Sequence, residues 1–301
     1  RFLERFKPEL GVILETEIWP MMAHQCKHKN VPLFLINARL SDKSLKQYLR
    51  FQSLAEETLE NFTMICTQSN KDRNNFQRLT RKKLEVVANL KFDFPIPKNL
   101  QLHAGKLRKE LGVTSNFVVV AGSTRTGEEK IILNYFKALP IDNVVLVIVP
   151  RHPQRFNEVE NLIKLSDLPY VRRSAVRNVN TKVKVILGDT MGDLYIYYGL
   201  ADLVLLGGSL ENFGSQNPIE PLRLGKPVAI GPSIYNFMDV IEKAEKQELI
   251  FRLNNIRGLE SLIKNMLKDA KNKALQKERH TFVETQSGGS KKVAALLNQY
   301  L

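Results

Sequence analysis

Short apolar runs alternate with longer amphipathic segments along almost the whole chain. Segments such as 128–139 and 237–247 have an apolar face with helical spacing. The short runs are rich in β-branched residues and are apolar on both faces, which is typical of buried parallel strands. They cover 11–14, 31–37, 62–66, 84–87, 117–121, 144–149, 183–187, 203–206 and 227–230. The pattern therefore predicts α/β domains with parallel sheets.

The segment 93–99 (DFPIPKN) is the best candidate for a domain boundary, because two prolines in a polar setting make a stiff, extended linker. We expect a first domain over residues 1–95, a second over 100–285 and a C-terminal helix over 286–301. Four strands before the linker would form a thin sheet with an exposed edge. We therefore expect the first domain to lack its opening strands, and a small complete domain is the alternative.

Composition narrows the function classes. A chain of 301 residues with 43% hydrophobic and 25% charged residues is neither disordered nor fibrous. The net charge of +14 favours anionic partners, but no basic run with interleaved aromatic residues indicates nucleic-acid binding. Two cysteines and no CxxC pair exclude a disulfide framework and a cysteine zinc site. No apolar run approaches the roughly 18 residues that span a bilayer, and we expect no signal peptide in this sequence.

Ligands of open α/β sheets bind beyond the carboxyl ends of the strands, so the residues after each apolar run are the candidates. The run 11–14 is followed by Glu15, Glu17 and Trp19. A carboxylate there could orient a cation, act as a base or stabilise positive charge in a transition state. Capping of the next helix is the alternative.

The residues after two further strands are suited to bind anions. Ser123 and Thr124 lie between a strand and the start of a helix, where free N–H groups and the helix dipole attract phosphate or carboxylate. A well-capped helix is the alternative. Arg151, between two prolines, offers a fixed fork of donors. The neighbouring His152 is either a catalytic acid or base or a supporting hydrogen-bond partner.

Two loops lead into helices with acidic residues near the start. Asp189 and Asp193 flank a turn before the helix expected near Leu194, and N-capping would explain one of these acids. A Gly/Ser loop leads to the segment 217–220, which fits a capping box. The same loop is also suited to a nucleotide. Glu220 could then accept hydrogen bonds from the ribose hydroxyls of that nucleotide. Together the strand ends predict a nucleotide-linked donor facing an acceptor across a two-domain cleft.

These motifs together resemble the 3-deoxy-D-manno-octulosonic acid (Kdo) transferase family of lipopolysaccharide biosynthesis, and the resemblance spans essentially the whole chain. The motifs, in chain order, are ETEIWP (15–20), NARLSDKS (37–44), ANLKFD (88–93), AGSTRTGEE (121–129), VPRHPQRF (149–156), GDTMGDL (188–194), GGSL (207–210) and NPIEP (217–221). The resemblance implies a GT-B fold, with two Rossmann-like domains and the active site between them. It further implies an inverting glycosyltransferase without metal or cofactor, which moves Kdo from CMP-Kdo to lipid A precursor (lipid IV-A) at the cytoplasmic face of the inner membrane.

The resemblance also assigns roles to residues of this chain. It makes Glu15 and Lys91 stabilisers of the transition state and puts Ser123 and Thr124 near the donor's phosphate or carboxylate. The residues that it assigns to CMP are Pro150, Arg151, Met191, Gly192, Asp193, Asn217, Pro218, Ile219 and Glu220. The family's general base and its membrane-anchoring helix precede the part that this sequence matches, so we expect neither within the chain.

The sequence departs from the family's usual residues at three positions, of which Asp193 is one of those assigned to CMP. Family members usually have His in place of Arg125 and Gln216, and Glu in place of Asp193. These changes alter the expected details of donor contact. Two alternative functions stay open: another GT-B enzyme of nucleotide sugars, and a fragment that binds nucleotide without catalysis.

Overall fold

The computed structural model describes residues 1–175, 182–268 and 271–301 and divides into two compact units. Unit 1 consists of Arg1–Phe94 together with Thr285–Leu301, and unit 2 of Pro95–Glu284. The boundary at Phe94 and Pro95 falls within the proline-containing segment 93–99. The last helix packs with unit 1, although its sequence neighbours belong to unit 2.

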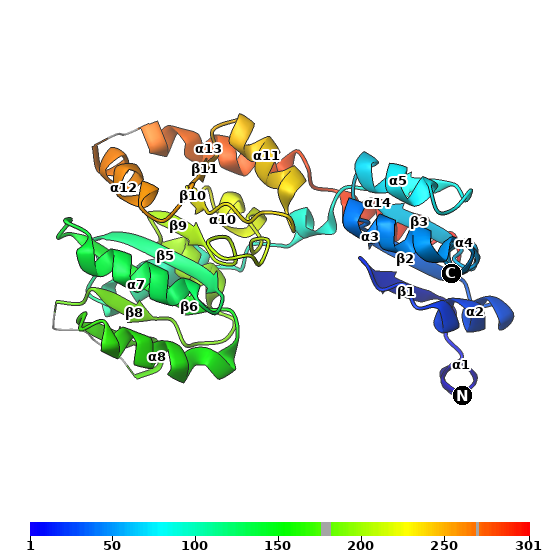
Figure 1. Ribbon diagram of the computed structural model, residues 1–301, viewed down its shortest axis with the longest axis horizontal. Coiled ribbons are helices and arrows are strands. Elements are labelled where there is room, and N and C mark those ends of the chain that lie inside the picture. Colours follow the sequence, from blue (N-terminus) through cyan, green and yellow to red (C-terminus); the bar gives the residue numbers. More distant parts are fainter. Residues whose placement is uncertain (176–181, 269–270) are drawn as a thin grey trace. The chain divides into compact units, whose positions relative to one another are not determined.

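Unit 1 holds a four-stranded parallel sheet in the order β1-β2-β3-β4 (Figure 1). Its elements are α1 (Phe2–Phe6), β1 (Gly11–Leu14), α2 (Pro20–His28), β2 (Leu33–Ala38), α3 (Asp42–Tyr48), η1 (Leu49–Phe51), α4 (Gln52–Glu60), β3 (Met64–Thr67), α5 (Asn70–Gln77), β4 (Leu84–Val86), η2 (Leu90–Asp93) and α14 (Gly289–Leu297). β1 lies at one edge of the sheet, and its Val12 and Leu14 are exposed.

Alternate residues of β2 explain why both faces of this sheet are covered. Leu33 and Leu35 pack with residues of α2, α3, α4 and α5 on one face. Phe34 and Ile36 point the other way and pack with Val293 of α14. A strand has a side-chain period of two, so an unbroken apolar run needs a partner on each side. The C-terminal helix provides the second partner.

Unit 2 holds a seven-stranded parallel sheet in the order β11-β10-β9-β5-β6-β8-β7. Its elements are α6 (Leu100–Glu110), β5 (Phe117–Thr124), α7 (Glu128–Ala138), β6 (Val144–Pro150), η3 (Pro153–Arg155), α8 (Phe156–Leu165), β7 (Tyr170–Arg172), η4 (Arg173–Ala175), β8 (Val185–Leu187), α9 (Leu194–Leu200), β9 (Leu203–Leu206), α10 (Ile219–Arg223), β10 (Val228–Ile230), α11 (Met238–Lys246), β11 (Ile250–Arg252), α12 (Gly258–Lys268) and α13 (Lys271–Glu284).

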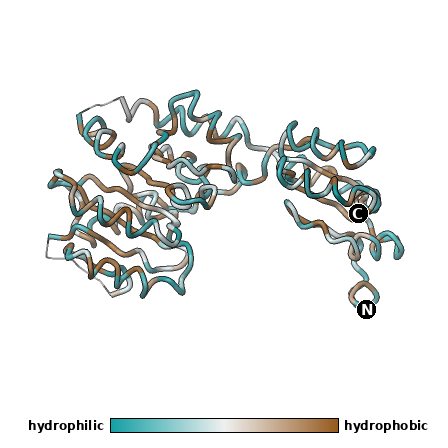
Figure 2. The backbone as a smooth tube through the Cα atoms, in the orientation of Figure 1, coloured by the Kyte–Doolittle hydropathy of each residue, from teal (hydrophilic) through white to brown (hydrophobic). Residues whose placement is uncertain are grey.

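The core of unit 2 follows the same alternation. Val119 and Ala121 of β5 pack with Leu146 of β6 and with side chains of α7, α8 and α12 on one face of the sheet. Gly122 of β5 faces Tyr198 of α9. Figure 2 shows the strands as mainly hydrophobic segments beneath more polar helices. The fold is thus a doubly wound parallel α/β arrangement, as the sequence predicts.

All nine apolar runs become strands, namely β1 to β6 and β8 to β10. The sequence pattern missed β7 and β11, which are three-residue strands at the two edges of the larger sheet. Within the described ranges no helix combines the length and apolarity needed to cross a bilayer.

Candidate functional site

The order in which strands are added to the larger sheet reverses between β5 and β9. From β5 the chain adds β6 and β8 on one side, and from β9 it adds β10 and β11 on the other. Ligand crevices in such sheets form at the carboxyl ends of the strands beside the reversal. Backbone bonds join these ends: the Gly207 N–H donates to the Gly122 carbonyl at 2.9 Å, and the Arg151 N–H donates to the Thr124 carbonyl at 3.0 Å. The segments after β5, β6 and β9 therefore lie side by side.

The turn from β5 to α7 rests on a buried network of charged side chains. Thr124 is fully buried, and its hydroxyl donates to Glu129 Oε1 at 2.7 Å. Arg155 donates to both oxygens of Glu129, at 2.7 and 3.1 Å. Hydrogen bonds to Glu129 and Glu158 raise the pKa of Arg155 further above its ordinary value. Ser123, before Thr124, is buried with a left-handed φ of 56°. Contact of Ser123 and Thr124 with a donor anion stays a prediction.

Glu128 fixes the glycine-rich loop that follows β9. Its fully buried carboxylate accepts the N–H groups of Gly208 at 2.7 Å, Arg125 at 2.8 Å and Leu210 at 2.9 Å. Burial raises the pKa of Glu128, and the three backbone N–H groups oppose that rise. The Arg125 N–H lies two residues before the N-cap Gly127, and α7 has no side-chain capping bond, so the alternative of a well-capped helix is wrong. One side chain thus joins the turns after β5 and β9.

Tyr198 of α9 packs against Gly122, near the carboxyl end of β5. A Cβ on Gly122 would stand 2.4 Å from the Tyr198 ring, so only glycine fits there. The pKa of Tyr198 is raised well above its ordinary value, by burial first and then by the negative charge of Glu220, while Arg151 opposes the rise. The charges of Arg151, after the end of β6, and Glu220, in α10, thus both act on the Tyr198 hydroxyl. Contact of either residue with CMP stays a prediction.

The start of α10 does not form the capping box that the sequence suggests, because its N-cap has no side-chain capping bond. Asn217 Oδ1 accepts the Ile219 N–H at 3.1 Å, and Asn217 Nδ2 donates to Glu220 Oε1 at 3.2 Å. Pro218 is the N-cap, in place of Asn217, and Leu222 donates its N–H to the Pro218 carbonyl. Since Pro218 and Ile219 are buried, the chain presents Asn217 and Glu220 at this helix start.

In the turn after β8, Met191 is exposed, whereas Asp189 is buried and hydrogen-bonded to other segments. Met191 is 71% exposed, and Gly192 has a φ of 84° with no neighbour in the place of a Cβ. Asp193 is the N-cap of α9 without a side-chain capping bond. Burial raises the pKa of Asp189, but hydrogen bonds from Ser174 and Arg172 outweigh it and hold that pKa below its ordinary value. β8 pairs with β6, which places this turn beside the strand that leads to Arg151.

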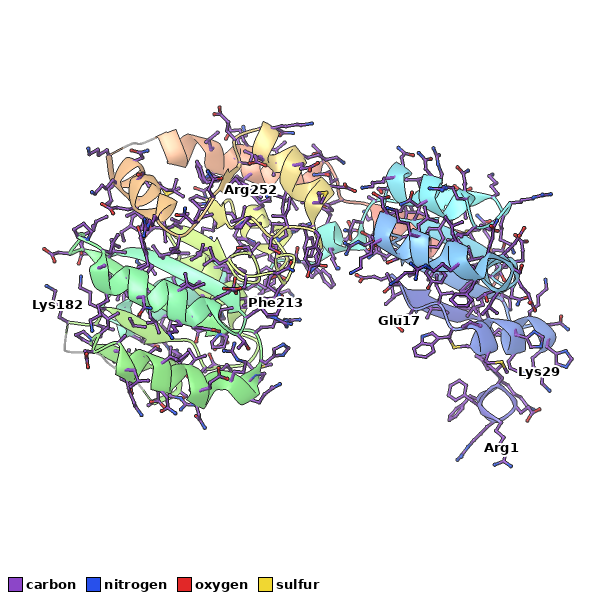
Figure 3. All side chains as sticks on the ribbon, in the orientation of Figure 1. Arg1, Glu17, Lys29, Lys182, Phe213 and Arg252 are labelled. Carbon is purple, nitrogen blue, oxygen red and sulfur yellow. The ribbon has the colours of Figure 1, made fainter. Side chains whose placement is uncertain are left out.

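Arg125 and His152 form a pair at the ends of β5 and β6. Arg125 Nη1 lies 2.7 Å from His152 Nε2, and the Arg125 guanidinium stands over the Phe213 ring at 4.8 Å from its centroid. Figure 3 shows Phe213 on unit 2. A guanidinium only donates hydrogen bonds, so His152 Nε2 accepts. In this arrangement His152 supports Arg125.

Unit 1 brings its two candidate catalytic residues together. Glu15 follows β1 with a φ of 59°, and its Oε1 lies 2.6 Å from Lys91 Nζ in η2. Buried Asn37, also left-handed, accepts the N–H of Leu90 and so fixes the segment that carries Lys91. The other acid of this motif, Glu17, accepts the Trp19 indole N–H at 2.9 Å and points outward (Figure 3). The catalytic role of Glu15 and Lys91 stays a prediction.

Sequence reasoning missed three residues that organise the site. Tyr198 lies in a helix whose sequence is typical of an ordinary buried helix. Arg155 pairs with Glu129 and Arg172 with Asp189, and neither partner is close in sequence. The motif VPRHPQRF contains Arg155 and could have drawn attention to it. In the part of the chain that the structure describes, no group of three histidine, cysteine or acidic residues is gathered in a way suited to a metal ion.

Family models match both units. Residues 1–94 match the family described as 3-deoxy-D-manno-octulosonic-acid transferase (kdotransferase), and residues 106–285 match glycosyl transferases group 1. The 3-deoxy-D-manno-octulosonic acid transferase of Bordetella pertussis is 30% identical over 308 residues, which cover 100% of this chain and 71% of that protein. The transferase of the same description from Haemophilus influenzae is 33% identical over 87% of this chain and 64% of that protein.

A third relative is longer still. A bifunctional glycosyltransferase/methyltransferase of Fusobacterium nucleatum is 36% identical over 84% of this chain, which corresponds to 40% of that protein. The chain thus spans between 40% and 71% of the length of these three relatives.

Solved structures agree with these families. The C-terminal CMP-Kdo binding domain of WaaA from Acinetobacter baumannii is 26% identical, with a TM-score of 0.58 over 62% of this chain and 99% of that chain. Anabaena Alr3699/HepE in complex with UDP is 18% identical, with a TM-score of 0.61 over 96% of this chain and 79% of that chain. The second likeness concerns the fold alone, and it agrees with the GT-B class expected from the sequence.

Proposed function

Since the chain belongs to the 3-deoxy-D-manno-octulosonic acid transferase family of glycosyltransferases, we propose that it is part of an enzyme that transfers Kdo from CMP-Kdo to a lipid A precursor, lipid IV-A. We place this activity at the cytoplasmic side of the inner membrane. The net charge of +14 suits phosphorylated lipid and an anionic membrane surface. Unit 2 binds the donor, and unit 1 contributes the residues that act on the reacting sugar.

One observation carries the donor half of this proposal. Arg151 follows the carboxyl end of β6 and Glu220 lies in the helix reached from β9, at the sheet edge where nucleotides bind in doubly wound folds, and both charges act on the buried Tyr198 hydroxyl. A guanidinium suits the single phosphate of CMP. A carboxylate on the helix start is suited to accept hydrogen bonds from ribose hydroxyls. The likeness of unit 2 to a CMP-Kdo binding domain supports the same ligand.

The remaining donor contacts are assigned by position. Pro150 precedes Arg151, and Met191, Gly192 and Asp193 form the turn beyond the neighbouring strand β8. Asn217, Pro218 and Ile219 set the geometry of the helix start that carries Glu220. Ser123 and Thr124 contribute to the environment of the donor's phosphate or carboxylate.

The proposed reaction is an inverting displacement. The acceptor hydroxyl oxygen forms a bond with the anomeric carbon of Kdo while the bond from that carbon to the phosphate oxygen breaks, and CMP leaves. Its transition state has oxocarbenium character, as in glycoside cleavage. Glu15 stabilises the developing positive charge, while Lys91 holds Glu15 in place and offsets anionic groups. The acceptor proton passes to a general base, for which no residue of this chain is assigned.

Calorimetry with CMP tests the donor assignment. Arg151→Ala removes a charged hydrogen bond to phosphate, which is worth about 1.5–3 kcal/mol, so CMP affinity should fall by about tenfold or more. The matched control is Arg257→Ala, which removes an exposed arginine of the same unit at the start of α12. It should bind CMP as the parent chain does. Equal CMP affinity in the Arg151 variant and the parent would refute the assignment.

A further inference from the structure

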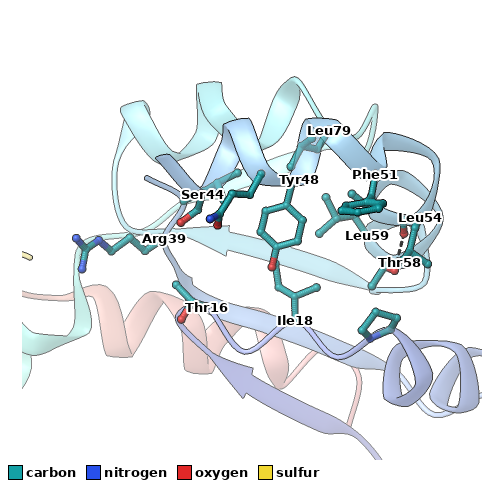
Figure 4. A pocket seen from close by; sticks show the side chains of 14 residues that line it. Thr16, Ile18, Arg39, Ser44, Tyr48, Phe51, Leu54, Thr58, Leu59 and Leu79 are labelled. Atoms are coloured by element: carbon teal, nitrogen blue, oxygen red, sulfur yellow. Dashed lines mark hydrogen bonds between the residues drawn. The ribbon is translucent and has the colours of Figure 1, made fainter. Parts of the chain in front are cut away.

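Unit 1 contains a cavity of about 400 Å³ that none of the proposed catalytic steps uses. It lies between the segment after β1, which contributes Thr16 and Ile18, and the helices α3, η1 and α4 (Figure 4). Its volume falls within the range of small-molecule sites, about 300–1,000 Å³. All of its lining residues belong to unit 1, so the cavity is a property of that unit alone.

The cavity is polar at one end and apolar at the other. Figure 4 shows Thr16, Arg39 and Ser44 at one end, and Phe51 and Leu54 at the opposite end, with the Tyr48 ring between them. At the apolar end Phe51 is 70% and Leu54 is 53% exposed. Exposed large apolar side chains that continue a cavity are typical of a binding site rather than of a solvated surface.

The polar end is cationic and close to the candidate catalytic pair. Arg39 is the charged residue that lines this end, beside the hydroxyl residues Thr16 and Ser44. Thr16 directly follows Glu15, and the Arg39 N–H donates to the Glu15 carbonyl at 3.3 Å. A ligand with its polar head at this end would therefore have that head next to Glu15.

We propose that this cavity binds one hydrocarbon chain of the lipid acceptor, with the anionic head of that lipid at the end formed by Thr16, Arg39 and Ser44. The shape and polarity of the cavity call for an amphiphile with one chain and a negative head. That this amphiphile is the acceptor rests on the proposed function. With this site the enzyme would bind an acylated acceptor more tightly than a phosphorylated sugar without a hydrocarbon chain.

Alkyl phosphates below their critical micelle concentration are the probes for this site. We expect octyl phosphate to bind the chain in calorimetry, with an affinity that rises about fourfold per methylene from butyl to octyl phosphate. Octyl glucoside has the same tail without the charge and should bind at least tenfold more weakly. Equal binding of the two octyl compounds, or no binding of octyl phosphate, would overturn the proposal.

Two pairs of variants locate the binding. Ala55→Leu fills the cavity from α4, whereas Ser53→Leu adds the same apolar group to the exposed side of that helix. Arg39→Gln removes the cation at the polar end, whereas Arg78→Gln removes an exposed arginine that does not line the cavity. The cavity variants should lose at least tenfold in octyl phosphate affinity, and their controls should lose less than twofold. Equal losses within either pair would refute this location.

A measurement on the unaltered chain covers the case in which a variant fails to fold. In methyl spectra of isoleucine-labelled protein, octyl phosphate should shift the Ile18 methyl signals and give contacts between Ile18 and the alkyl chain. Unchanged Ile18 signals at saturation would overturn the proposal. CMP binding reports the proposed function independently: if CMP fails to bind while octyl phosphate occupies the cavity, the donor assignment falls and the lipid site stands.

Discussion

Glu128→Gln is the most informative single change, because it keeps the size of the side chain but removes one of its two acceptor oxygens. In the parent chain the carboxylate accepts three backbone N–H groups, from Arg125, Gly208 and Leu210, at 2.7–2.9 Å and with no solvent exposure. If the remaining oxygen keeps the bonds to Gly208 and Arg125, the new amide nitrogen faces the Leu210 N–H as donor against donor.

The magnitude follows from that single lost bond. A hydrogen bond to a charged group contributes about 1.5–3 kcal/mol, and the variant also avoids burying a charge, which offsets part of the loss. We expect a decrease of about 1–2 kcal/mol in the free energy of unfolding. The loop that leads to Asn217 and Glu220 then has to be ordered again when CMP binds. CMP affinity should therefore fall about 5–30-fold, the factor that corresponds to 1–2 kcal/mol.

Urea unfolding and CMP calorimetry measure both effects. Glu211→Gln is the matched control, since Glu211 is an exposed acid in the same loop and its replacement makes the same change in charge. Surface changes of this kind usually alter stability by less than about 0.5 kcal/mol. If Glu128→Gln matches the control in both assays, the claim that this carboxylate anchors the loop is wrong.

The pH dependence gives the sign of the Glu128 contribution. Burial raises the pKa of Glu128 above its ordinary value of 4.5. Its contribution to stability is therefore fully present below that value and declines as the pH rises through the folded-state pKa. The stability difference between the parent and Glu128→Gln should be larger at pH 4 than at pH 7. The opposite trend would show that the three N–H groups outweigh burial.

Four other predictions follow from particular contacts. In the full-length enzyme, Lys91→Met should lower the rate of Kdo transfer about 100-fold or more; because its pair with Glu15 is partly exposed, stability should change by no more than about 1 kcal/mol, and an unaltered rate would remove Lys91 from catalysis. The pKa of Asp189 is lowered, so its contribution to stability is lost as the pH falls below 3.8, and an Asp189→Asn variant that keeps the acid sensitivity of the parent would contradict this. Nitrogen NMR should find His152 protonated on Nδ1 alone and on a mixture of nitrogens in Arg125→Ala; one unchanged tautomer in both would refute the pairing. EDTA should leave transfer by the full-length enzyme intact, and strict dependence on added Mg²⁺ would be the contrary result.

The fold was predictable because each central strand is buried on both sides. A strand in that position has to be apolar at every residue, and the sequence records this directly, for example at 117–121 and 203–206. β7 and β11 lie at the sheet edges and consist of three residues each, such as Tyr170–Arg172, so their burial is partial and neither has an apolar run longer than three residues.

Long-range packing was less visible in the sequence. The pattern predicts the C-terminal helix, but no local signal shows that Val293 covers the sheet of the first unit or that Asp93 accepts the N–H groups of Gly288 and Ser290. These partners are nearly two hundred residues apart in the chain. Local periodicity identifies which face of a helix is apolar but leaves its partner open.

Some residues of the candidate site could also be identified from the sequence, and others could not. Strand-end positions such as Arg151 and Glu220 could be singled out because parallel strands bring their carboxyl ends to one edge. Tyr198, whose pKa both of these charges affect, could not be singled out, since a buried aromatic residue in a helix looks like ordinary core in the sequence. The bonds of Glu128 to the Gly208 loop depend on strand order, which only the structure supplies.

A crystal structure of the chain with CMP tests the central claim most directly. We expect the CMP phosphate to lie within hydrogen-bond distance of the Arg151 guanidinium, about 3 Å, and the ribose hydroxyls to contact the Glu220 carboxylate. CMP bound away from the carboxyl ends of β5, β6 and β9, or bound there with neither residue in contact, would contradict it.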